Sequence, residues 1–297
     1  MGSNLKEVRE RIKSVVSTQQ ITNAMKMVAA ARLRRAQNAI IKLRPFAKKL
    51  NDILHHILTD LNGEGGTIYS KPREVKKALI IIVTSNRGLC GAFNSNILKE
   101  AIRIAGNYEN IRKEGGLAFL CIGKRGYDGI RKRYPDCTII NEFVYLFDDL
   151  SFSSVVEVPN LLMQYYETGE YDIMHVCYSR FKNAAVQYAE EVQYLPVPAF
   201  EFENRSLRAR RADFLFEPDQ KRLLDHLVPN ILQTTFNRFL LDTHASEHGA
   251  RMTAMEQATE NANEILRDLR TSYNKARQEA ITREISEIVG GAAALEG

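Results

Sequence analysis

The stretch MTAMEQATENANEILRDLRTSYNKA, residues 252–276, decides the fold class of this chain. Apolar or small side chains return along it at alternating steps of three and four residues: Met252, Met255, Thr259, Ala262, Leu266, Leu269, Tyr273 and Ala276. This spacing is typical of a coiled coil, in which one stripe of a helix, called the seam below, faces a partner helix. The sequence therefore predicts a long C-terminal helix with a partner elsewhere in the chain.

The N-terminal segment, residues 4–61, shows the same repeat and predicts that partner. Its apolar positions form two sets: Leu5, Val8, Ile12 and Val15, then Ala36, Ile40, Leu43, Ala47, Leu50, Leu54, Ile57 and Leu61. Between the two sets the repeat weakens into Gln19, Gln20, Thr22 and the basic run MKMVAAARLRRAQ, residues 25–37. The glycine-rich run NGEGG, residues 62–66, predicts the end of this helix.

Charge and length indicate how the two helices pair. Ten Lys or Arg and no Asp or Glu lie between Arg11 and Asn51, whereas the C-terminal helix is rich in acids. Because the two helices flank one compact domain, the economical arrangement is an antiparallel pair. Opposite charge favours their association, although each exposed ion pair contributes only a few tenths of a kcal/mol. If Leu61 lies level with about residue 215, equal rise sets Leu5 level with about residue 271.

The C-terminal helix then extends roughly 20 residues beyond its partner. This extension carries apolar side chains at Ile281, Ile285, Ile288 and Val289 and has no partner helix in the chain. Because an isolated amphipathic helix is marginal in water, either the extension frays or another protein surrounds it.

The middle of the chain predicts an α/β domain with a largely parallel sheet, because β-branched runs alternate there with helical stretches. The strand-like runs are KKALIIIVTS at 76–85, GLAFLCIG at 116–123, CTIINEFVYL at 137–146, DIMHVCYSRF at 172–181 and the edge candidate AVQYAEEVQYLPV at 185–197. The predicted fold class is thus α/β plus coiled coil. A long antiparallel two-helix coiled coil, residues 1–61 and 213–290, carries an inserted Rossmann-like α/β domain at 70–200.

Composition narrows the function classes. The hydrophobic content of 44% and net charge of +5 are ordinary for a globular protein, and no run approaches the ~20 apolar residues of a membrane helix. The N-terminus lacks the apolar core of a secretory signal. The four cysteines, Cys90, Cys121, Cys137 and Cys177, are widely spaced, which predicts reduced thiols rather than a zinc or redox pair.

Two motifs could be ligand-binding sites or ordinary structural segments. HASEH, residues 244–248, fits the H-x-x-E-H zinc pattern, but it lies in a coiled-coil helix, so solvated surface histidines are expected instead. TSNRGLCGAFN, residues 84–94, follows a strand and precedes a helix as phosphate-binding loops do. It lacks both G-x-G-x-x-G and G-K-[ST], so a structural turn is favoured, with Arg87 left as a candidate partner contact.

Two further function classes are open to a basic coiled coil. The basic stripe at 11–51 suits nucleic acid, but Phe46 is its only aromatic residue and its seam is committed to a partner helix, so no nucleic-acid partner is predicted. A coiled-coil scaffold or tether explains the repeats but not the extension beyond the partner helix. It remains the alternative function.

The whole chain resembles the gamma subunits of the F-type ATP synthases. The resemblance rests on RIKSVVSTQQITNAMKMVAAARLRRAQ at 11–37, TSNRGLCGAFN at 84–94, LFEPD at 215–219 and the C-terminal run ARMTAMEQATENANEILRDLRTSYNKARQEAITREISEIVGGAAAL at 250–295. It implies a central-stalk rotor, surrounded by three alpha and three beta subunits and bound to the epsilon subunit and the c ring. Rotation would couple proton translocation to ATP synthesis or hydrolysis, with the active sites on beta, so no catalytic residue, cofactor or metal is expected here.

The resemblance also implies which residues touch partners. Met25 and Lys26 would face acidic beta loops, and Arg277, Gln278 and Thr282 would bind a beta loop near the C-terminus. Phe216 and Glu217 would lie near the epsilon subunit and the c ring. The chain would sit at the cytoplasmic face of the bacterial plasma membrane, as a peripheral protein held there only through the complex.

Overall fold

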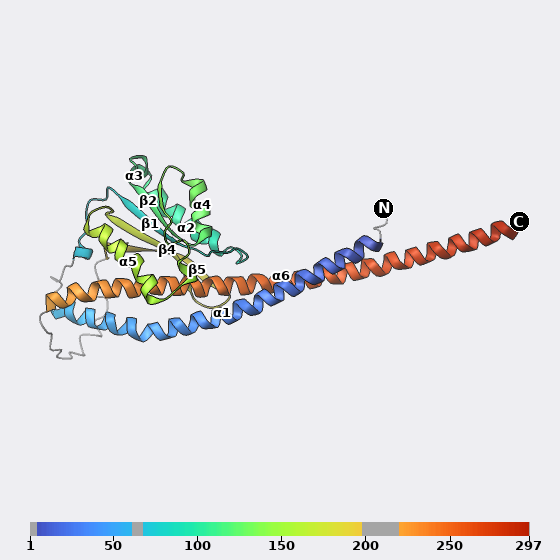
Figure 1. The fold of residues 1–297 in the computed structure, drawn as a ribbon, viewed down its shortest axis with the longest axis horizontal. Helices are drawn as coiled ribbons and strands as arrows, with labels where there is room; N and C mark the ends of the chain where they lie inside the picture. Colours follow the sequence, from blue (N-terminus) through green and yellow to red (C-terminus); the bar gives the residue numbers. More distant parts are fainter. Residues whose placement is uncertain (1–4, 61–67, 198–219, 297) are drawn as a thin grey trace. The chain divides into compact units, whose positions relative to one another are not determined.

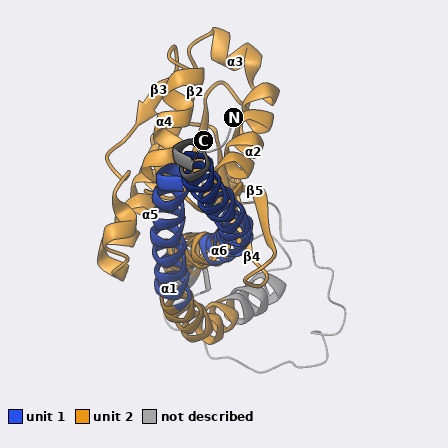
Figure 2. Cartoon of the chain, turned by 90° about the vertical axis from the view of Figure 1, so that its right-hand side faces the viewer, with its two compact units in different colours: residues 1–30, 251–297 blue, residues 31–250 orange. Residues whose placement is uncertain are grey.

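The computed structural model describes residues 5–60, 68–197 and 220–296. The chain forms two compact units, coloured separately in Figure 2. Unit 1 contains residues 1–30 and 251–297, and unit 2 contains residues 31–250. Two long helices, α1 (Leu5–Asp60) and α6 (Gln220–Glu296), each contribute to both units (Figure 1). The predicted start of the C-terminal helix before residue 220 lies outside the described residues.

In unit 1, the predicted seam of α6 is confirmed at every position. Met255, Ala262 and Leu266 are buried, and the other five seam residues named above are half-buried. On α1, Val8 is buried and Leu5, Ile12 and Val15 are half-buried. The two helix segments therefore pack along the stripe that the repeat predicts.

The stretch of α1 where the apolar repeat weakens still faces α6, because polar side chains fill the seam there. Gln19 Nε2 donates to Asn263 Oδ1 at 2.8 Å, and the hydroxyls of Thr22 and Thr259 lie 2.8 Å apart. Lys26 Nζ lies 2.5 Å from Glu256 Oε1. The contact between α1 and α6 therefore continues through this stretch, although its side chains are polar rather than apolar.

These three polar pairs show that the helices run antiparallel and correct the predicted register. The residue numbers of the facing partners add up to 282, 281 and 282. Leu5 is therefore level with about residue 277 rather than about 271, a shift of about one and a half helical turns. The predicted register was wrong because it was set from the ends of the helices, whereas the polar pairs fix it in the middle.

Unit 2 is built on a five-stranded sheet: β1 (Ala78–Val83), β2 (Leu117–Ile122), β3 (Thr138–Ile140), β4 (Ile173–Phe181) and β5 (Gln187–Leu195). The strand order is β3-β2-β1-β4-β5. The first four strands are parallel, and β5 pairs antiparallel with β4 at the edge, as predicted for residues 185–197. The helices of the domain are α2 (Phe93–Asn107), α3 (Glu109–Lys113), α4 (Lys124–Arg133) and α5 (Phe152–Glu167), with short 3-10 turns at Ile68–Ser70 and Leu146–Asp148.

Helices cover both faces of this sheet, so β1 and β2 are buried along their whole length. On one face α2 and α4 pack against Ile80, Phe119 and Cys121. On the other face α5 and residues 224–240 of α6 pack against the alternate side chains, among them Leu79 and Leu120. The result is the layered α/β arrangement that the alternating strand and helix runs predict.

Within unit 2, α6 belongs to the core of the domain as well as to the helix pair. Phe236 and Phe239 are buried in the core cluster of α5, and the Phe239 ring lies 4.4 Å from that of Tyr178 on β4. Tyr194 donates its hydroxyl to the Leu232 carbonyl at 3.0 Å. This packing anchors the first part of α6 to the sheet.

The third strand is much shorter than the run CTIINEFVYL suggests. After Ile140 the chain turns, and Val144 donates its N–H to the Asn141 carbonyl at 3.3 Å. The Val144 carbonyl then accepts from Gly123 N at 3.0 Å, and its side chain is buried against the face covered by α2 and α4. The apolar residues after Ile140 thus fill the core from a turn rather than from a strand.

Candidate functional site

The H-x-x-E-H stretch on α6 is buried, so the expectation of solvated histidines was wrong. His244 Nε2 and His248 Nε2 lie 3.0 Å apart, and the His244 ring stacks on Phe147 at 5.9 Å. Glu247 and His248 are buried, because the α/β domain packs onto this side of α6 through contacts such as Ser246 Oγ to the Ser179 carbonyl. Among the described residues, no group of three or more His, Cys, Asp or Glu side chains is arranged to hold a metal ion.

The loop after β1 accepts three hydrogen bonds from backbone amides at the start of α4. Thr84 Oγ1 accepts from Gly126 N at 2.8 Å, the Ser85 carbonyl accepts from Arg125 N, and Asn86 Oδ1 accepts from Lys124 N. These three N–H groups form the first turn of α4, so the loop after β1 is tied to the start of the helix that follows β2. The hydrogen bonds give the loop a structural role, joining the ends of β1 and β2.

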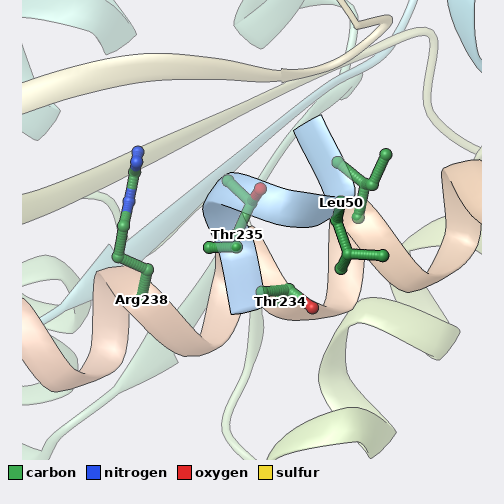
Figure 3. A pocket seen from close by; sticks show the side chains of 6 residues that line it. Leu50, Thr234, Thr235 and Arg238 are labelled. Carbon is green, nitrogen blue, oxygen red and sulfur yellow. The ribbon is translucent and has the colours of Figure 1, made fainter. Parts of the chain in front are cut away.

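A small cavity in unit 2 is also unsuited to a ligand. It has a volume of about 20 Å³ and lies between the two long helices (Figure 3). Its lining residues are Ala47, Leu50, Ile231, Thr234, Thr235 and Arg238. A volume of this size holds about one water molecule.

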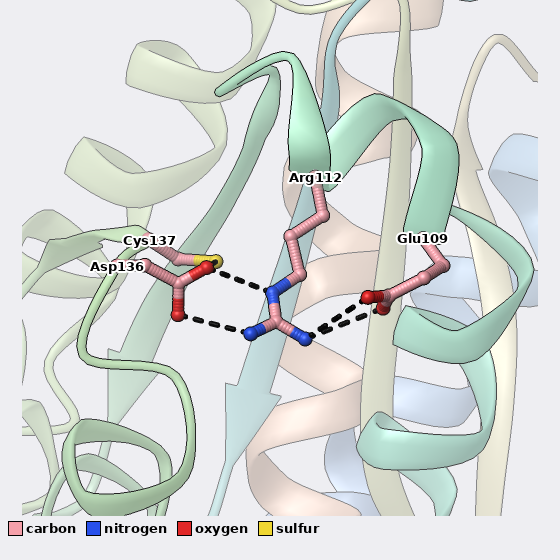
Figure 4. A network of polar contacts seen from close by, with 4 residues as sticks. All are labelled: Glu109, Arg112, Asp136 and Cys137. Atoms are coloured by element: carbon pink, nitrogen blue, oxygen red, sulfur yellow. Dashed lines mark hydrogen bonds and ion pairs between the residues drawn. The ribbon is translucent and has the colours of Figure 1, made fainter.

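All four cysteines are free thiols, as predicted. Burial raises the pKa of the Cys121 thiol to about 12 and also raises that of the Cys177 thiol. Cys137 is half-buried beside the network in which Arg112 binds Asp136 at 2.9 and 3.1 Å and Glu109 at 3.3 Å (Figure 4). Burial also raises the pKa of the Cys137 thiol, so none of these three has the lowered pKa of a reactive cysteine.

Asp242 on α6 is a half-buried carboxyl whose pKa is shifted toward neutral pH. Burial raises the pKa of its carboxyl to about 6, against the lowering influence of Arg238, Arg44 and Arg180. The folded chain therefore holds a proton on Asp242 at pH values where the unfolded chain, with a pKa of 3.8, does not.

Replacing Asp242 by asparagine is expected to raise the free energy of unfolding by about 2 kcal/mol at pH 8 and by less than about 1 kcal/mol at pH 4. Since the folded-state pKa is the higher one, wild-type stability falls as the pH rises from about 4 to about 6 and stays lower above that range. Urea unfolding at the two pH values measures the difference. Asp268→Asn, at an exposed position of the same helix, is the control, and an equal gain at both pH values would contradict the assignment.

The predicted partner contacts on α1 lie in unit 1 and are half-buried. Met25 and Lys26 sit beside the seam, and the ammonium of Lys26 is already paired with Glu256. Both members of this pair keep substantial exposure, 36% for Lys26 and 45% for Glu256. A carboxylate from another protein could therefore reach Lys26, but it would compete with Glu256.

The predicted contacts on α6 are fully outside the helix pair. Ala276 is the last half-buried residue, and residues 277–291, called the C-terminal extension below, are all exposed. The extension includes Arg277, Gln278 and Thr282, and Figure 1 shows it continuing past the N-terminal end of α1. Its four large apolar side chains, Ile281, Ile285, Ile288 and Val289, are 48% to 65% exposed. Phe216 and Glu217 lie outside the described residues.

Sequence reasoning missed four exposed apolar side chains on the helix pair of unit 1. Ile21, Met27 and Val28 on α1 and Ile265 on α6 are 49% to 61% exposed. Ile21 and Val28 are seven residues apart, so they share one face of α1. Their positions outside the spacing of the seam are the signal that could have identified them.

The chain matches known proteins over nearly its whole length. The family model described as ATP synthase matches residues 4–295. The ATP synthase gamma chain of Cytophaga hutchinsonii is 47% identical over 98% of this chain and 99% of its own length. That of Flavobacterium psychrophilum is 45% identical over 99% of this chain and 100% of its own length. In the part of the chain that the structure describes, no helix is long and apolar enough to span a bilayer.

Solved structures agree in fold. A chain of the Tetrahymena thermophila mitochondrial ATP synthase central stalk and c ring is 26% identical, with a TM-score of 0.56 over 80% of this chain and 99% of that one. A chain of the Euglena gracilis mitochondrial ATP synthase, at 20% identity, has a TM-score of 0.62 over 98% of this chain and 94% of that one, which supports the fold alone. With the family model and the full-length identities, these findings show that the chain belongs to the family of ATP synthase gamma chains.

Proposed function

We propose that the chain is the central-stalk rotor of an F-type ATP synthase, carrying rotation between the proton-driven c ring and the catalytic beta subunits. In this way it couples proton translocation to ATP synthesis or hydrolysis. The observation that carries the proposal is the C-terminal extension, a helix with a row of exposed isoleucines and no partner in the described part of the chain. Such a helix is stable only inside a socket of other polypeptides, here the alpha and beta subunits.

Unequal helices suit this role. In unit 1 the seam pairs one shorter helix with one that continues alone, and exposed apolar side chains lie on both. A ring of three identical subunit pairs around such an asymmetric helix pair meets a different surface at each of its three positions. Each beta site then has a different binding free energy, and rotation passes these differences from one site to the next.

No chemical step is assigned to this chain. We expect ATP chemistry on the beta subunits, so the chain is proposed as a non-catalytic subunit of the complex. The expected cellular place is the cytoplasmic face of the bacterial plasma membrane. The chain would be attached there only through the epsilon subunit and the c ring, near Phe216 and Glu217.

Reconstitution of the full chain with alpha, beta, epsilon and the c ring tests this function. A rotor subunit is expected to restore ATP-driven proton pumping to complexes that lack it. The alternative, a scaffold or tether, predicts assembly of the complex with ATP hydrolysis but without pumping. Failure of the chain to bind alpha and beta would contradict both.

Met25→Lys is expected to lower the number of protons pumped per ATP roughly twofold or more. The new ammonium lies one residue from Lys26, competes for Glu256 and adds an attraction to acidic beta loops that resists rotation. Proton pumping and ATP hydrolysis are measured on the same reconstituted complex, with Met25→Leu as the control of similar volume. Unchanged pumping per ATP would contradict the proposed contact at Met25.

A further inference from the structure

We propose that the three polar pairs of unit 1, Gln19–Asn263, Thr22–Thr259 and Lys26–Glu256, fix the axial register of the coiled coil. They would thereby act as positioning residues that keep α1 and α6 from sliding past each other under load. The proposal concerns register and stands on geometry alone. Its consequence for coupling rests on the proposed function.

The apolar part of the seam does not define the register by itself. Met255, Ala262, Leu269 and Ala276 on α6 are spaced by seven residues, and so are Thr259, Leu266 and Tyr273. A slip of α1 by seven residues would again place its apolar side chains opposite apolar or small ones. The side chains of Ala29 and Ala262 are small, so their packing differs little between one register and another offset by a heptad.

The polar pairs distinguish these alternatives. A slip of seven residues toward the C-terminus of α6 would place Thr22 opposite Leu266, Lys26 opposite Asn263 and Gln19 opposite Arg270. A slip the other way would place Thr22 opposite Met252 and Gln19 opposite Glu256. In either case the Lys26–Glu256 ion pair and the hydroxyl pair are lost, and a half-buried hydroxyl faces an apolar side chain.

The threonine pair is the most restrictive of the three. Thr22 is buried and Thr259 half-buried, and their hydroxyl oxygens lie 2.8 Å apart. Thr22 Oγ1 also lies 3.0 Å from the Gln19 carbonyl, and Thr259 Oγ1 lies 2.8 Å from the Met255 carbonyl. Two hydroxyl hydrogens serve these three contacts, so one hydroxyl donates across the seam while the other donates to its own helix. Only the observed register brings the two hydroxyls together.

The other two polar pairs flank the threonine pair along the helix axis and support the same register. Gln19–Asn263 is a neutral amide pair at 2.8 Å, and Lys26–Glu256 is a charged pair at 2.5 Å on the opposite side of the threonines. The threonine pair lies within the seam, and the other two pairs lie beside it. A single polar layer is known to specify the register of coiled coils, and here two flanking pairs support that layer.

Distance measurements between spin labels on the full chain test the register directly. Labels at Ser17→Cys and Glu264→Cys, both exposed, report the axial offset of the helices after Cys137→Ser removes the half-exposed thiol. The test variant carries Gln19→Leu, Thr22→Val, Lys26→Met, Glu256→Met, Thr259→Val and Asn263→Leu. We expect one narrow distance in the parent and a second, longer one in the variant, displaced by a heptad rise of about 10 Å along the axis.

The matched control carries Thr18→Val and Thr271→Val, which are exposed threonines on the same two helices, and keeps the single distance. A single unchanged distance in the six-site variant would overturn the proposal.

Charge reversal gives a second test that keeps the seam polar. Lys26→Glu and Glu256→Lys, each alone, place like charges across the seam and should broaden the distance distribution. The double reversal should restore it, and equal behaviour of single and double variants would count against the ion pair.

Pumping by the reconstituted complex then separates the two proposals. Loss of pumping with a shifted register supports both. Normal pumping with a shifted register upholds the role in register and contradicts the need for a fixed helix pair in rotation.

Discussion

Replacing Gly123 by alanine is expected to destabilise unit 2 by about 4 kcal/mol or more, enough to unfold a domain of ordinary stability. Gly123 joins β2 to α4 with φ +98° and ψ 129°, a region that is costly for any residue with a Cβ. A Cβ built there would lie 2.0 Å from the Thr84 carbonyl oxygen and 2.5 Å from its carbon. Both are backbone atoms at the end of β1, so relief requires moving a central strand.

Two other glycines separate the cost of the positive φ from the cost of the steric clash in Gly123→Ala. Gly115 also has a positive φ, +76°, but nothing lies within 4 Å of its Cβ position, so Gly115→Ala should cost only about 1 kcal/mol. Gly106 is inside α2 with open space around it, and Gly106→Ala should stabilise by about 0.5–1 kcal/mol. Urea unfolding followed by far-UV circular dichroism ranks the three variants. A cost for Gly123→Ala no larger than that for Gly115→Ala would show that Thr84 can move away.

The sequence predicted the fold well where burial has a period. The steps of three and four on α6 located all eight seam residues, and the β-branched runs located β1, β2, β4 and β5. These signals are local, because each depends only on which side of one helix or strand is apolar. The prediction of a strand over the whole run 137–146 was wrong because the signal is local. The apolar residues after Ile140 fill the core from a turn, and a local apolar run does not distinguish such a turn from a strand.

Periodicity could not predict the register of α1 against α6, nor the burial of a second side of α6 by the α/β domain. An apolar repeat of seven residues is compatible with several offsets, and only pairs such as Thr22–Thr259 select one. Recognising them requires knowing both partners at once. His248 was misplaced on the surface because the seam describes only one contact of α6. Its burial comes from the α/β domain on another side of the helix, which no periodicity within residues 244–248 reveals.

The family resemblance, rather than periodicity, predicted the partner contacts. Arg277, Gln278 and Thr282 were assigned through the family resemblance, and the structure places them on the exposed C-terminal extension. Lys26 was assigned in the same way but is engaged by Glu256 of its own chain. The exposed Ile21, Met27 and Val28 nearby had no such assignment. Their roles as contacts stay predictions until partner chains are bound.

Ending the chain at Ala276 is expected to leave the isolated chain folded while nearly abolishing its function. Residues 277–291 are exposed throughout, so their removal should change the free energy of unfolding by less than about 1 kcal/mol and lower the helical signal only by the residues lost. In the complex the same residues are expected to be buried. If Ile281, Ile285, Ile288 and Val289 each contribute about 1 kcal/mol there, affinity for the alpha and beta subunits falls by nearly a thousandfold, on the order of 10³.

Proton pumping by reconstituted complexes, measured beside the affinity, shows whether the extension transmits rotation or only helps assembly. A full-length control with Ile281→Ala, Ile285→Ala, Ile288→Ala and Val289→Ala keeps the length and helix propensity but removes most of the apolar surface. If the row of side chains is what the socket holds, this control should behave like the truncated chain. If the control pumps normally, the backbone length matters rather than the apolar row. Normal pumping by the truncated chain would contradict any role of the extension in rotation, because that chain lacks all of residues 277–291.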